Sequence, residues 1–529
     1  MPGITLAALL LAAIASVGIA VYGVRLARTT SDFLVASRSV GAGWNAAAIS
    51  GEYLSAASFL GVAGLIAKYG ADALWYPVGF TAGYLGLLLF VAAPLRRSGA
   101  YTVPDFAEFR LGSLRLRRLS ALTVVLICAV YLIPQFQGAG LTLRILLGVP
   151  GWVGAVAVAA IVIGTVASGG MRSITFVQAF QYWLKLTAVA LPALVLAAHF
   201  LHGDRVFDTT ELSAAGADWL TPGGGLGGPH PMFQVYSLIA ATFLGTMGLP
   251  HVLVRFYTNP DGRAARSTAV TVIGLVGLFY LFPTLLGVFA RLYVPGLVSA
   301  DKSDAAVLLL PGSVLDGLPG QLLGALVAAG AIAAFLSTSS GLLVSIAGVV
   351  STDILRGRIR DFRVAALVSG AVPLGLSFAV ASLDLSRTVG LAFAVAASTL
   401  CPLLVLGIWW RGLTARGAAA GLLAGGLTAG TATVVSVSGG VPAHLAGGWL
   451  AAVLGYPAAV SVPLSFLTMI VVSKLSTGQS AREVARIFVR MHAPEGLGLG
   501  ADREPGLRQA GPLTAPKRPF TAQPGTFAE

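Results

Sequence analysis

Apolar segments of about 20 residues recur from the start of this chain to about residue 474, and they constrain its fold more than any other feature. A helix needs about 20 residues to cross the hydrocarbon core of a bilayer, where every backbone polar group must be bonded internally. This length criterion predicts an all-α polytopic membrane protein with about 13 transmembrane helices. The segments run near residues 4–24, 43–67, 73–94, 120–146, 150–170, 176–202, 236–257, 268–293, 320–350, 363–383, 388–410, 416–437 and 452–474.

The distribution of charge indicates how these segments are oriented. Only 10% of the residues are charged, whereas soluble domains carry about 25%. The net charge of +13 comes from arginines in alternate loops, the pattern that marks cytoplasmic loops, so no nucleic-acid partner is needed to explain it. We expect a multi-pass protein of the cell (plasma) membrane with its N-terminus outside and its C-terminus in the cytoplasm. The predicted cytoplasmic loops contain Arg96, Arg97, Arg263, Arg266, Arg411 and Arg416.

Two regions differ in composition. Residues 1–474 form the predicted membrane domain, and residues 475–529 form a cytoplasmic tail. In the tail, Ser480 followed by Glu483 predicts a capping box for a short amphipathic helix, and the Pro/Gly-rich sequence after Pro494 predicts disorder. Cys128, Cys401 and the six histidines form no cluster with metal-ligand spacing, and no phosphate-binding loop is present. We therefore expect no cofactor and no ATP-driven pump.

The first unusual stretch within a predicted span contains Glu52. Glu52 follows Gly51 and lies near Ser50, Ser55 and Ser58. An ionisable residue inside a membrane is costly and indicates a functional site, and a glycine beside it favours unwinding that exposes carbonyls to a cation. Glu52 has three possible uses: an ionised group that strengthens cation binding, a proton carrier, or a neutral acid bonded to a backbone carbonyl in a Gly/Ser packing face.

Two further stretches are unusual. Gly245-Thr-Met-Gly248-Leu-Pro250 predicts a kink or break in its helix. His251, which follows it, is either a proton relay or a structural residue near a helix end, and Arg255 is expected to anchor at the cytoplasmic surface. The third stretch, Ser337-Thr-Ser-Ser340, offers hydroxyl oxygens to a cation such as Na⁺, or serves helix packing.

These stretches, with Tyr101-Thr-Val-Pro-Asp-Phe106 and Leu391-Ala-Phe-Ala-Val-Ala-Ala-Ser398, resemble the sodium–solute symporter family. The likeness is strongest to its cation–acetate symporter (acetate permease) branch. It extends from Ser31 to about Lys474. The resemblance implies a leucine-transporter-like fold, in which two inverted five-helix repeats, about 43–202 and 236–410, surround a mid-membrane site and further spans flank them.

The resemblance also implies which residues form the cation site. A sodium site would use the carbonyls of Gly51, Leu54 and Ala334 and the hydroxyls of Ser337 and Thr338. From the unusual stretches themselves, and not from the resemblance, we expect Glu52, Ser55, Ser58, Gly248 and His251 to bind the substrate or couple it to the cation. The acetate branch carries Asp where this chain has Glu52. We expect no intramembrane Lys or Arg to pair with a substrate carboxylate, so a helix N-terminus and hydroxyls would bind it.

The function implied by this resemblance is secondary active symport, with no enzymatic activity. The solute would be a small monocarboxylate of the acetate, propionate or pyruvate class, and the coupling ion Na⁺ or H⁺. The partners are then the solute, the cation and the lipid bilayer. A symporter for another solute (proline, a sugar or a vitamin acid) is the main alternative, while a nutrient sensor, a channel and a membrane enzyme fit the sequence less well.

Overall fold

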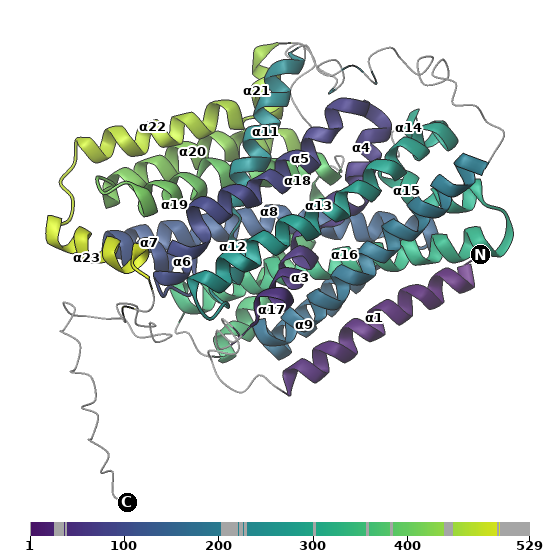
Figure 1. Ribbon diagram of the computed structural model, residues 1–529, viewed down its shortest axis with the longest axis horizontal. Coiled ribbons are helices and arrows are strands. Elements are labelled where there is room, and N and C mark those ends of the chain that lie inside the picture. The colour runs from purple at the N-terminus through teal and green to yellow at the C-terminus, as the bar shows by residue number, and fades with distance from the viewer. Residues whose placement is uncertain are drawn as a thin grey trace, which may run out of the picture.

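The computed structural model of the chain describes residues 2–25, 40–202, 230–299, 303–355, 359–380, 385–438 and 448–494, and also residues 36, 219, 221, 226 and 497. All regular secondary structure within these residues is helical, which confirms the predicted all-α class. The helices pack side by side into one bundle (Figure 1). The predicted outside loop after His202 and the region of predicted disorder after Pro494 fall largely outside the described residues.

The first half of the chain forms helices up to residue 202. Their bounds are α1 (Pro2–Val24), α3 (Ala42–Tyr53), η2 (Ala57–Gly61), α4 (Val62–Tyr69), η3 (Gly70–Leu74), α5 (Trp75–Gly86), η4 (Leu87–Val91), α6 (Ala92–Arg97), α7 (Val103–Leu111), α8 (Leu114–Leu147) and α9 (Gly151–His202).

The second half begins at residue 231. Its helices are α11 (Pro231–Gly248), α12 (Pro250–Phe256), α13 (Gly262–Tyr293), α14 (Pro295–Ser299), α15 (Ser303–Val314), α16 (Gly317–Val349), η5 (Val350–Ile354), α17 (Ile359–Ala379), α18 (Leu385–Ser398), α19 (Leu400–Trp409), α20 (Ala415–Val437), α21 (Trp449–Gly455), α22 (Ala458–Lys474) and α23 (Ala481–His492).

Nine helical runs among the described residues are long and apolar enough to cross a membrane, or eleven if each of two bent pairs counts as one span. Two of these runs are interrupted at a glycine with a positive φ. Gly151–His202 has 52 residues, about 78 Å at 1.5 Å per residue, whereas the hydrocarbon core is about 30 Å thick. It contains two helices joined at Gly170, where φ is 58°. Ala57–Arg97, 41 residues long, is interrupted at Gly70, where φ is 60°. Dividing both runs accounts for the difference from the predicted 13 segments.

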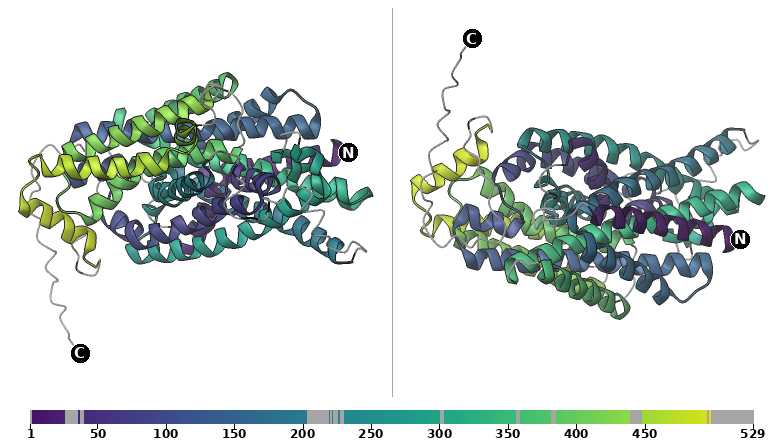
Figure 2. Two further views of the ribbon diagram at one scale, coloured as in Figure 1. Left: turned by 90° about the horizontal axis from the view of Figure 1, so that it is seen from above. Right: turned by 90° about the horizontal axis from the view of Figure 1, so that it is seen from below.

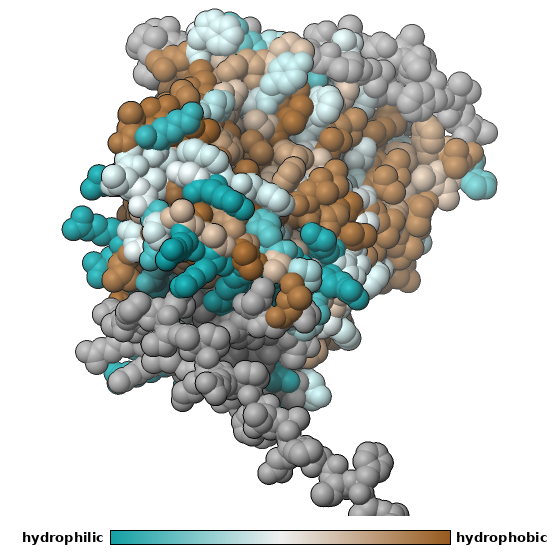
Figure 3. Space-filling view, turned by 60° about the vertical axis from the view of Figure 1, so that its left-hand side comes forward, coloured by the Kyte–Doolittle hydropathy of each residue, from teal (hydrophilic) through white to brown (hydrophobic). Residues whose placement is uncertain are grey.

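The surface of the bundle carries large apolar side chains along its length. Leu10, Leu11 and Ile14 of α1 are 52–67% exposed, and α17, α20 and α22 present similar faces. Figure 3 shows broad apolar areas along the bundle, with polar side chains concentrated elsewhere on the surface. Exposed apolar bands of this kind suit contact with lipid rather than water. The start of α1 and helix α23 lie at opposite ends of the bundle (Figures 1 and 2).

Arg110 joins the tail helix α23 to the bundle. Its guanidinium donates hydrogen bonds to the carbonyls of Gly407 at 2.8 Å and Trp410 at 3.1 Å, and lies 5.0 Å from the ring of Phe488 in α23. Burial lowers the pKa of Arg110 to about 10, so the group stays charged at neutral pH and retains both interactions. Ser480 and Glu483 form a reciprocal capping box at the start of α23.

Candidate functional site

Helix α3 ends in the middle of the bundle and exposes backbone groups there. Its last residue is Tyr53, and Leu54 has φ −73° and ψ 84°, outside the helical region. The π-helix η2 begins at Ala57, so the carbonyls that precede the break lack their usual partners in the next turn. One freed group, the N–H of Ala56, donates to Oε1 of Gln135 on α8 at 3.3 Å. The unwinding predicted beside Gly51 therefore lies three to four residues after it.

The ammonium group of Lys185 lies at this break. Its Nζ donates hydrogen bonds to the carbonyls of Gly51 and Leu54, the latter at 2.6 Å, and to Oγ of Ser337 at 2.8 Å. These three atoms belong to the predicted cation site. Lys185 is fully buried on α9, and the sequence analysis did not place a lysine at the cation site. The signal was present in the sequence as the one lysine of the apolar segment 176–202.

The other two residues of the predicted cation site belong to the same hydrogen-bonded group. Ser337 donates its hydroxyl proton to the carbonyl of Ala334 at 3.2 Å, and Thr338 donates to the carbonyl of Glu52 at 2.6 Å. Since the Ser337 proton is already used and carbonyls only accept, Lys185 must supply three N–H donors, which only an ammonium group has. The structure thus brings together all five predicted residues around a lysine that the sequence analysis did not place there.

Glu52 forms a buried ion pair with Arg255. Their atoms Oε2 and Nε are 2.7 Å apart, and each side chain is 1% exposed. Arg255 also donates to Oγ1 of Thr175 at 2.7 Å and to Oε1 of Gln178. The prediction that Arg255 anchors at the cytoplasmic surface is therefore wrong, because its side chain is buried and paired with Glu52. The partner of Glu52 is a guanidinium and not a backbone carbonyl. This contact does not match the interpretation of Glu52 as a neutral acid bonded to a backbone carbonyl.

Gln178 connects the ion pair to the lysine. Its Nε2 donates to the carbonyl of Ser337 at 2.8 Å, while its Oε1 accepts from Arg255. The centre of the bundle therefore contains one network with the charges of Lys185, Arg255 and Glu52, which sum to +1 when all three are ionised. Burial and hydrogen bonding make these charges costly to separate.

The second break lies between α11 and α12, which are bent by 41°. Leu249 has an extended backbone (φ −71°, ψ 117°) between Gly248 and Pro250, so the predicted kink is present. A Cβ atom on Gly248 would lie 2.5 Å from the carbonyl oxygen of Ala396, which explains why a glycine stands there. His251 follows the break, is 0% exposed, and has no hydrogen-bond partner for either ring nitrogen among the described residues.

Polar and aromatic side chains gather between the two breaks. The ring of Tyr131 lies 5.4 Å from that of His251, and the buried hydroxyl of Ser55 has no hydrogen-bond partner among the described residues. Nε2 of Gln135, one turn further along α8, is buried without a partner among the described residues. Ser58, predicted alongside Ser55, instead shares a hydrogen bond of 2.8 Å with the hydroxyl of Tyr280. Of the two serines, only Ser55 thus lies beside groups that still lack partners.

Aromatic rings restrict the space around this polar group. Phe393 of α18 lies 4.8 Å from Phe80, 5.9 Å from Tyr131 and 6.1 Å from Tyr53, measured between ring centroids. Tyr53 donates to the carbonyl of Phe80 at 3.0 Å and is bonded to Thr246. Centroid distances of this size are those of aromatic rings in direct contact.

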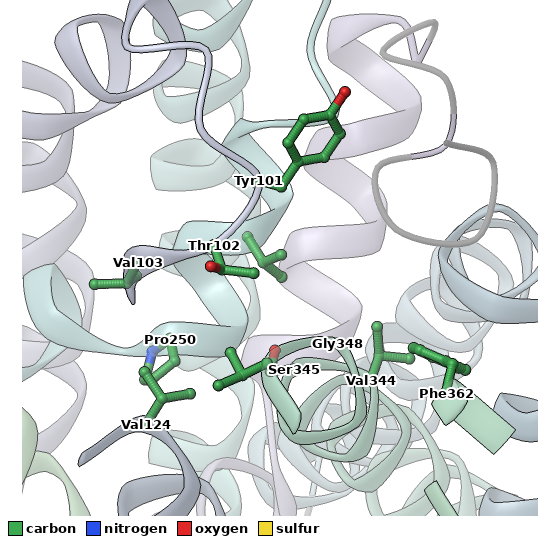
Figure 4. A pocket seen from close by; sticks show the side chains of 11 residues that line it. Tyr101, Thr102, Val103, Val124, Pro250, Val344, Ser345, Gly348 and Phe362 are labelled. Atoms are coloured by element: carbon green, nitrogen blue, oxygen red, sulfur yellow. The ribbon is translucent and has the colours of Figure 1, made fainter. Parts of the chain in front are cut away.

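A small pocket lies next to the second break (Figure 4). Pro250, the neighbour of His251, forms part of its wall, and Ser345 of α16 contributes a hydroxyl without a partner among the described residues. Its other end is formed by Tyr101 and Thr102, which precede α7. The remaining lining residues are Val103, Val124, Val254, Val344, Gly348, Val349 and Phe362. The pocket therefore extends from the loop before α7 to the residue beside His251.

Comparisons with known proteins agree with this arrangement. The family described as "Sodium:solute symporter family" matches residues 33–425. A relative from Bacillus subtilis (strain 168), described as "Uncharacterized symporter YwcA", is 33% identical over 490 residues, which cover 89% of this chain and 94% of the relative.

Two solved structures share the fold. One, described as a substrate-bound outward-open state of a Na⁺-coupled sialic acid symporter, has a TM-score of 0.67 at 16% identity and covers 90% of this chain and 99% of its own. The other, the nucleobase-cation-symport-1 family transporter Mhp1 in a closed conformation, has a TM-score of 0.52 at 15% identity and covers 87% of this chain and 98% of its own. These likenesses establish the leucine-transporter-like fold.

Proposed function

This chain belongs to the sodium:solute symporter family and is a secondary symporter, and we propose that it imports a small monocarboxylate of the acetate, propionate or pyruvate class. The driving ion in this proposal is Na⁺ or H⁺. The solute binds between the breaks of α3 and α11–α12, beside Tyr131, Gln135 and His251.

The observation that carries this proposal is a pair of buried side chains without partners. Nε2 of Gln135 and both ring nitrogens of His251 lack partners among the described residues, and both side chains flank Tyr131. A buried donor without a partner costs about 1–3 kcal/mol, so such groups indicate a ligand that accepts hydrogen bonds. A carboxylate is an acceptor only, and it fits the amide, the phenol and an imidazole N–H.

The charges near this position favour an anion. Lys185, Arg255 and Glu52 together carry +1, and the carboxylate of Glu52 is already paired with Arg255. A bound monocarboxylate brings the sum to zero, whereas a sugar or zwitterionic proline leaves it at +1. The aromatic contacts of Phe393 also favour a solute of a few heavy atoms over a sugar.

The test is uptake by purified protein in proteoliposomes. Radiolabelled acetate, propionate and pyruvate are compared with proline and glucose, and the Na⁺ and H⁺ gradients are imposed separately. We expect accumulation of the monocarboxylates alone. Accumulation of proline or glucose without any monocarboxylate would overturn the proposal.

A variant then tests the position of the site. Gln135→Glu keeps the acceptor for the Ala56 N–H but replaces the free amide donor by an oxygen. Loss of a hydrogen bond to a charged ligand is worth about 1.5–3 kcal/mol, so the apparent affinity should fall roughly 10- to 150-fold. Ser120→Ala, which removes another buried hydroxyl from α8, is the matched control and should transport normally.

The proposal includes an arrangement in the membrane. Two inverted repeats, about 43–202 and 236–410, surround the site in the plasma membrane, with the N-terminus outside and the tail from residue 475 in the cytoplasm. It is supported by the central position of both helix breaks and by the location of α1 and α23 at opposite ends of the bundle.

A further inference from the structure

We propose that the ammonium group of Lys185 is the cation of the site that the family resemblance assigns to Na⁺, and that uptake by this chain requires no Na⁺. The inference deepens the proposed function and rests on it only for the choice of solute in the uptake assay. It changes which ion the site contains and leaves the identity of the solute untouched.

The nitrogen atom of Lys185 lies among the oxygens that the resemblance implies for Na⁺. Nζ of Lys185 is hydrogen-bonded to two carbonyls from the end of α3 and one hydroxyl from α16, which are three of the five oxygens implied for Na⁺. The other two oxygens are engaged as well, since the carbonyl of Ala334 accepts from Ser337 and the hydroxyl of Thr338 donates to a carbonyl of α3. The oxygen ligands thus fit a cation, but the chain itself supplies that cation.

Na⁺ and this ammonium group exclude each other. Both would need the same oxygens, so the two positive charges would lie about 3 Å apart. At an effective dielectric constant of about 20, repulsion at that distance lowers ion affinity roughly 10⁴-fold. Among the described residues, the carboxylate near the lysine is that of Glu52, which is already paired with Arg255 and does not offset a second cation.

The packing of α9 against α16 holds Lys185 in place. Gln178 and Lys185 are seven residues apart, two helical turns, and therefore lie on one face of α9. Both contact Ser337, through its carbonyl and its hydroxyl respectively. Close to them a Cβ atom on Gly330 of α16 would lie 2.4 Å from Cβ of Ala188. The two helices are therefore in tight contact close to Lys185, whose side chain is buried.

Of the two ions in the proposed function, H⁺ then remains as the driving ion. The charged groups that face this region are Lys185 from α9, Glu52 from α3 and Arg255 from α12. The inference itself depends only on where the lysine nitrogen lies.

Direct measurement of ²²Na⁺ binding to purified protein tests this inference without reference to the solute. We expect no saturable binding by the wild type. Lys185→Ala should acquire saturable binding, because it removes the charge and opens the space among the oxygens. If the alanine variant does not fold, Lys185→Met, which keeps about the length of the side chain without its charge, replaces it in the binding assay. Lys474→Met, at the exposed end of α22, is the matched lysine control and should behave as the wild type.

Uptake provides the second readout. Replacing Na⁺ by N-methyl-glucamine on both sides should change wild-type uptake by less than about twofold, and a H⁺ gradient alone should drive accumulation. The inference is overturned if the wild type binds ²²Na⁺ saturably and Ser337→Ala removes that binding, or if uptake falls about tenfold or more without Na⁺. Na⁺-dependent uptake of a monocarboxylate would overturn this inference and leave the proposed function intact. Absence of monocarboxylate uptake would overturn the proposed function and leave this inference intact, since the ²²Na⁺ binding assay still decides the role of Lys185.

Discussion

Glu52→Gln should destabilise the protein and impair transport, because it removes one charge of a buried ion pair. Glutamine keeps the volume and one acceptor oxygen but cannot ionise. The hydrogen bond of 2.7 Å from Nε of Arg255 can therefore persist, while the charge of the guanidinium loses its counter-charge. Thr175 and Gln178 still accept from the same guanidinium.

The magnitude follows from the burial of the pair. Removing one partner of a buried ion pair costs about 3–5 kcal/mol, and the remaining bonds of Arg255 place this substitution near 3 kcal/mol. With an unfolding entropy of about 2.1 cal/mol/K per residue, a chain of this length unfolds with roughly 1.1 kcal/mol/K, so the apparent Tm should fall by roughly 3 °C. In Arg255→Met the carboxylate remains uncompensated, and the fall should be at least as large.

The assay is thermal unfolding of purified protein, combined with uptake in proteoliposomes between about pH 5.5 and 8, a range that spans the reference pKa of histidine. The two single variants remove the same interaction. The loss in free energy of unfolding of the double variant Glu52→Gln/Arg255→Met should therefore be smaller than the sum of the two single losses, by at least about 2 kcal/mol. Glu483→Gln, an equivalent substitution in the exposed capping box of α23, is the matched control. An unchanged Tm together with normal accumulation across this pH range would refute the reasoning.

Three further outcomes are expected. Cysteine introduced at Ser480 should be labelled only from the cytoplasmic side. Cysteine introduced at Ser213, which is outside the described residues, should be labelled only from the other side. Labelling of both cysteines from one side would contradict the proposed topology. Ser55→Ala should raise the solute concentration for half-maximal uptake several-fold, about the value of one hydrogen bond, whereas Ser58→Ala should raise it less because its hydroxyl is bonded to a tyrosine. Gly248→Ala should reduce folded yield and uptake, because its Cβ would lie 2.5 Å from a backbone oxygen; fluorescence-detected size exclusion that shows a normal yield would contradict this.

The positions of the helices and their breaks followed from local sequence signals. Segment lengths predicted the apolar helices, and the glycine and proline of Gly248-Leu-Pro250 predicted the bend between α11 and α12. The break of α3 was predicted beside Gly51 and lies at Leu54, since a glycine indicates where a helix can unwind without setting the residue at which it does. These features depend on residues a few positions apart, which a single sequence displays.

The partners of the buried charges could not be predicted in the same way. Glu52 and Arg255 are separated by 203 positions, and Lys185 lies 134 positions from Gly51. Arg255 was assigned to the membrane surface because it is near the end of an apolar segment, but the bend at Leu249 keeps α12 inside the bundle. Lys185 was missed because one lysine hardly changes the hydropathy of a long apolar segment.

A tethered cation has a consequence that a bound ion does not share. A bound Na⁺ links α3 to α16 only while it occupies the site, so the strength of that link depends on the Na⁺ concentration. Lys185 links the same two helices through Leu54 and Ser337, but its local concentration is set by α9 and not by the solution. The affinity for the solute should therefore be independent of external Na⁺ in the wild type. It should become dependent on Na⁺ in Lys185→Ala, because an ion from solution must then supply the contact between the end of α3 and α16.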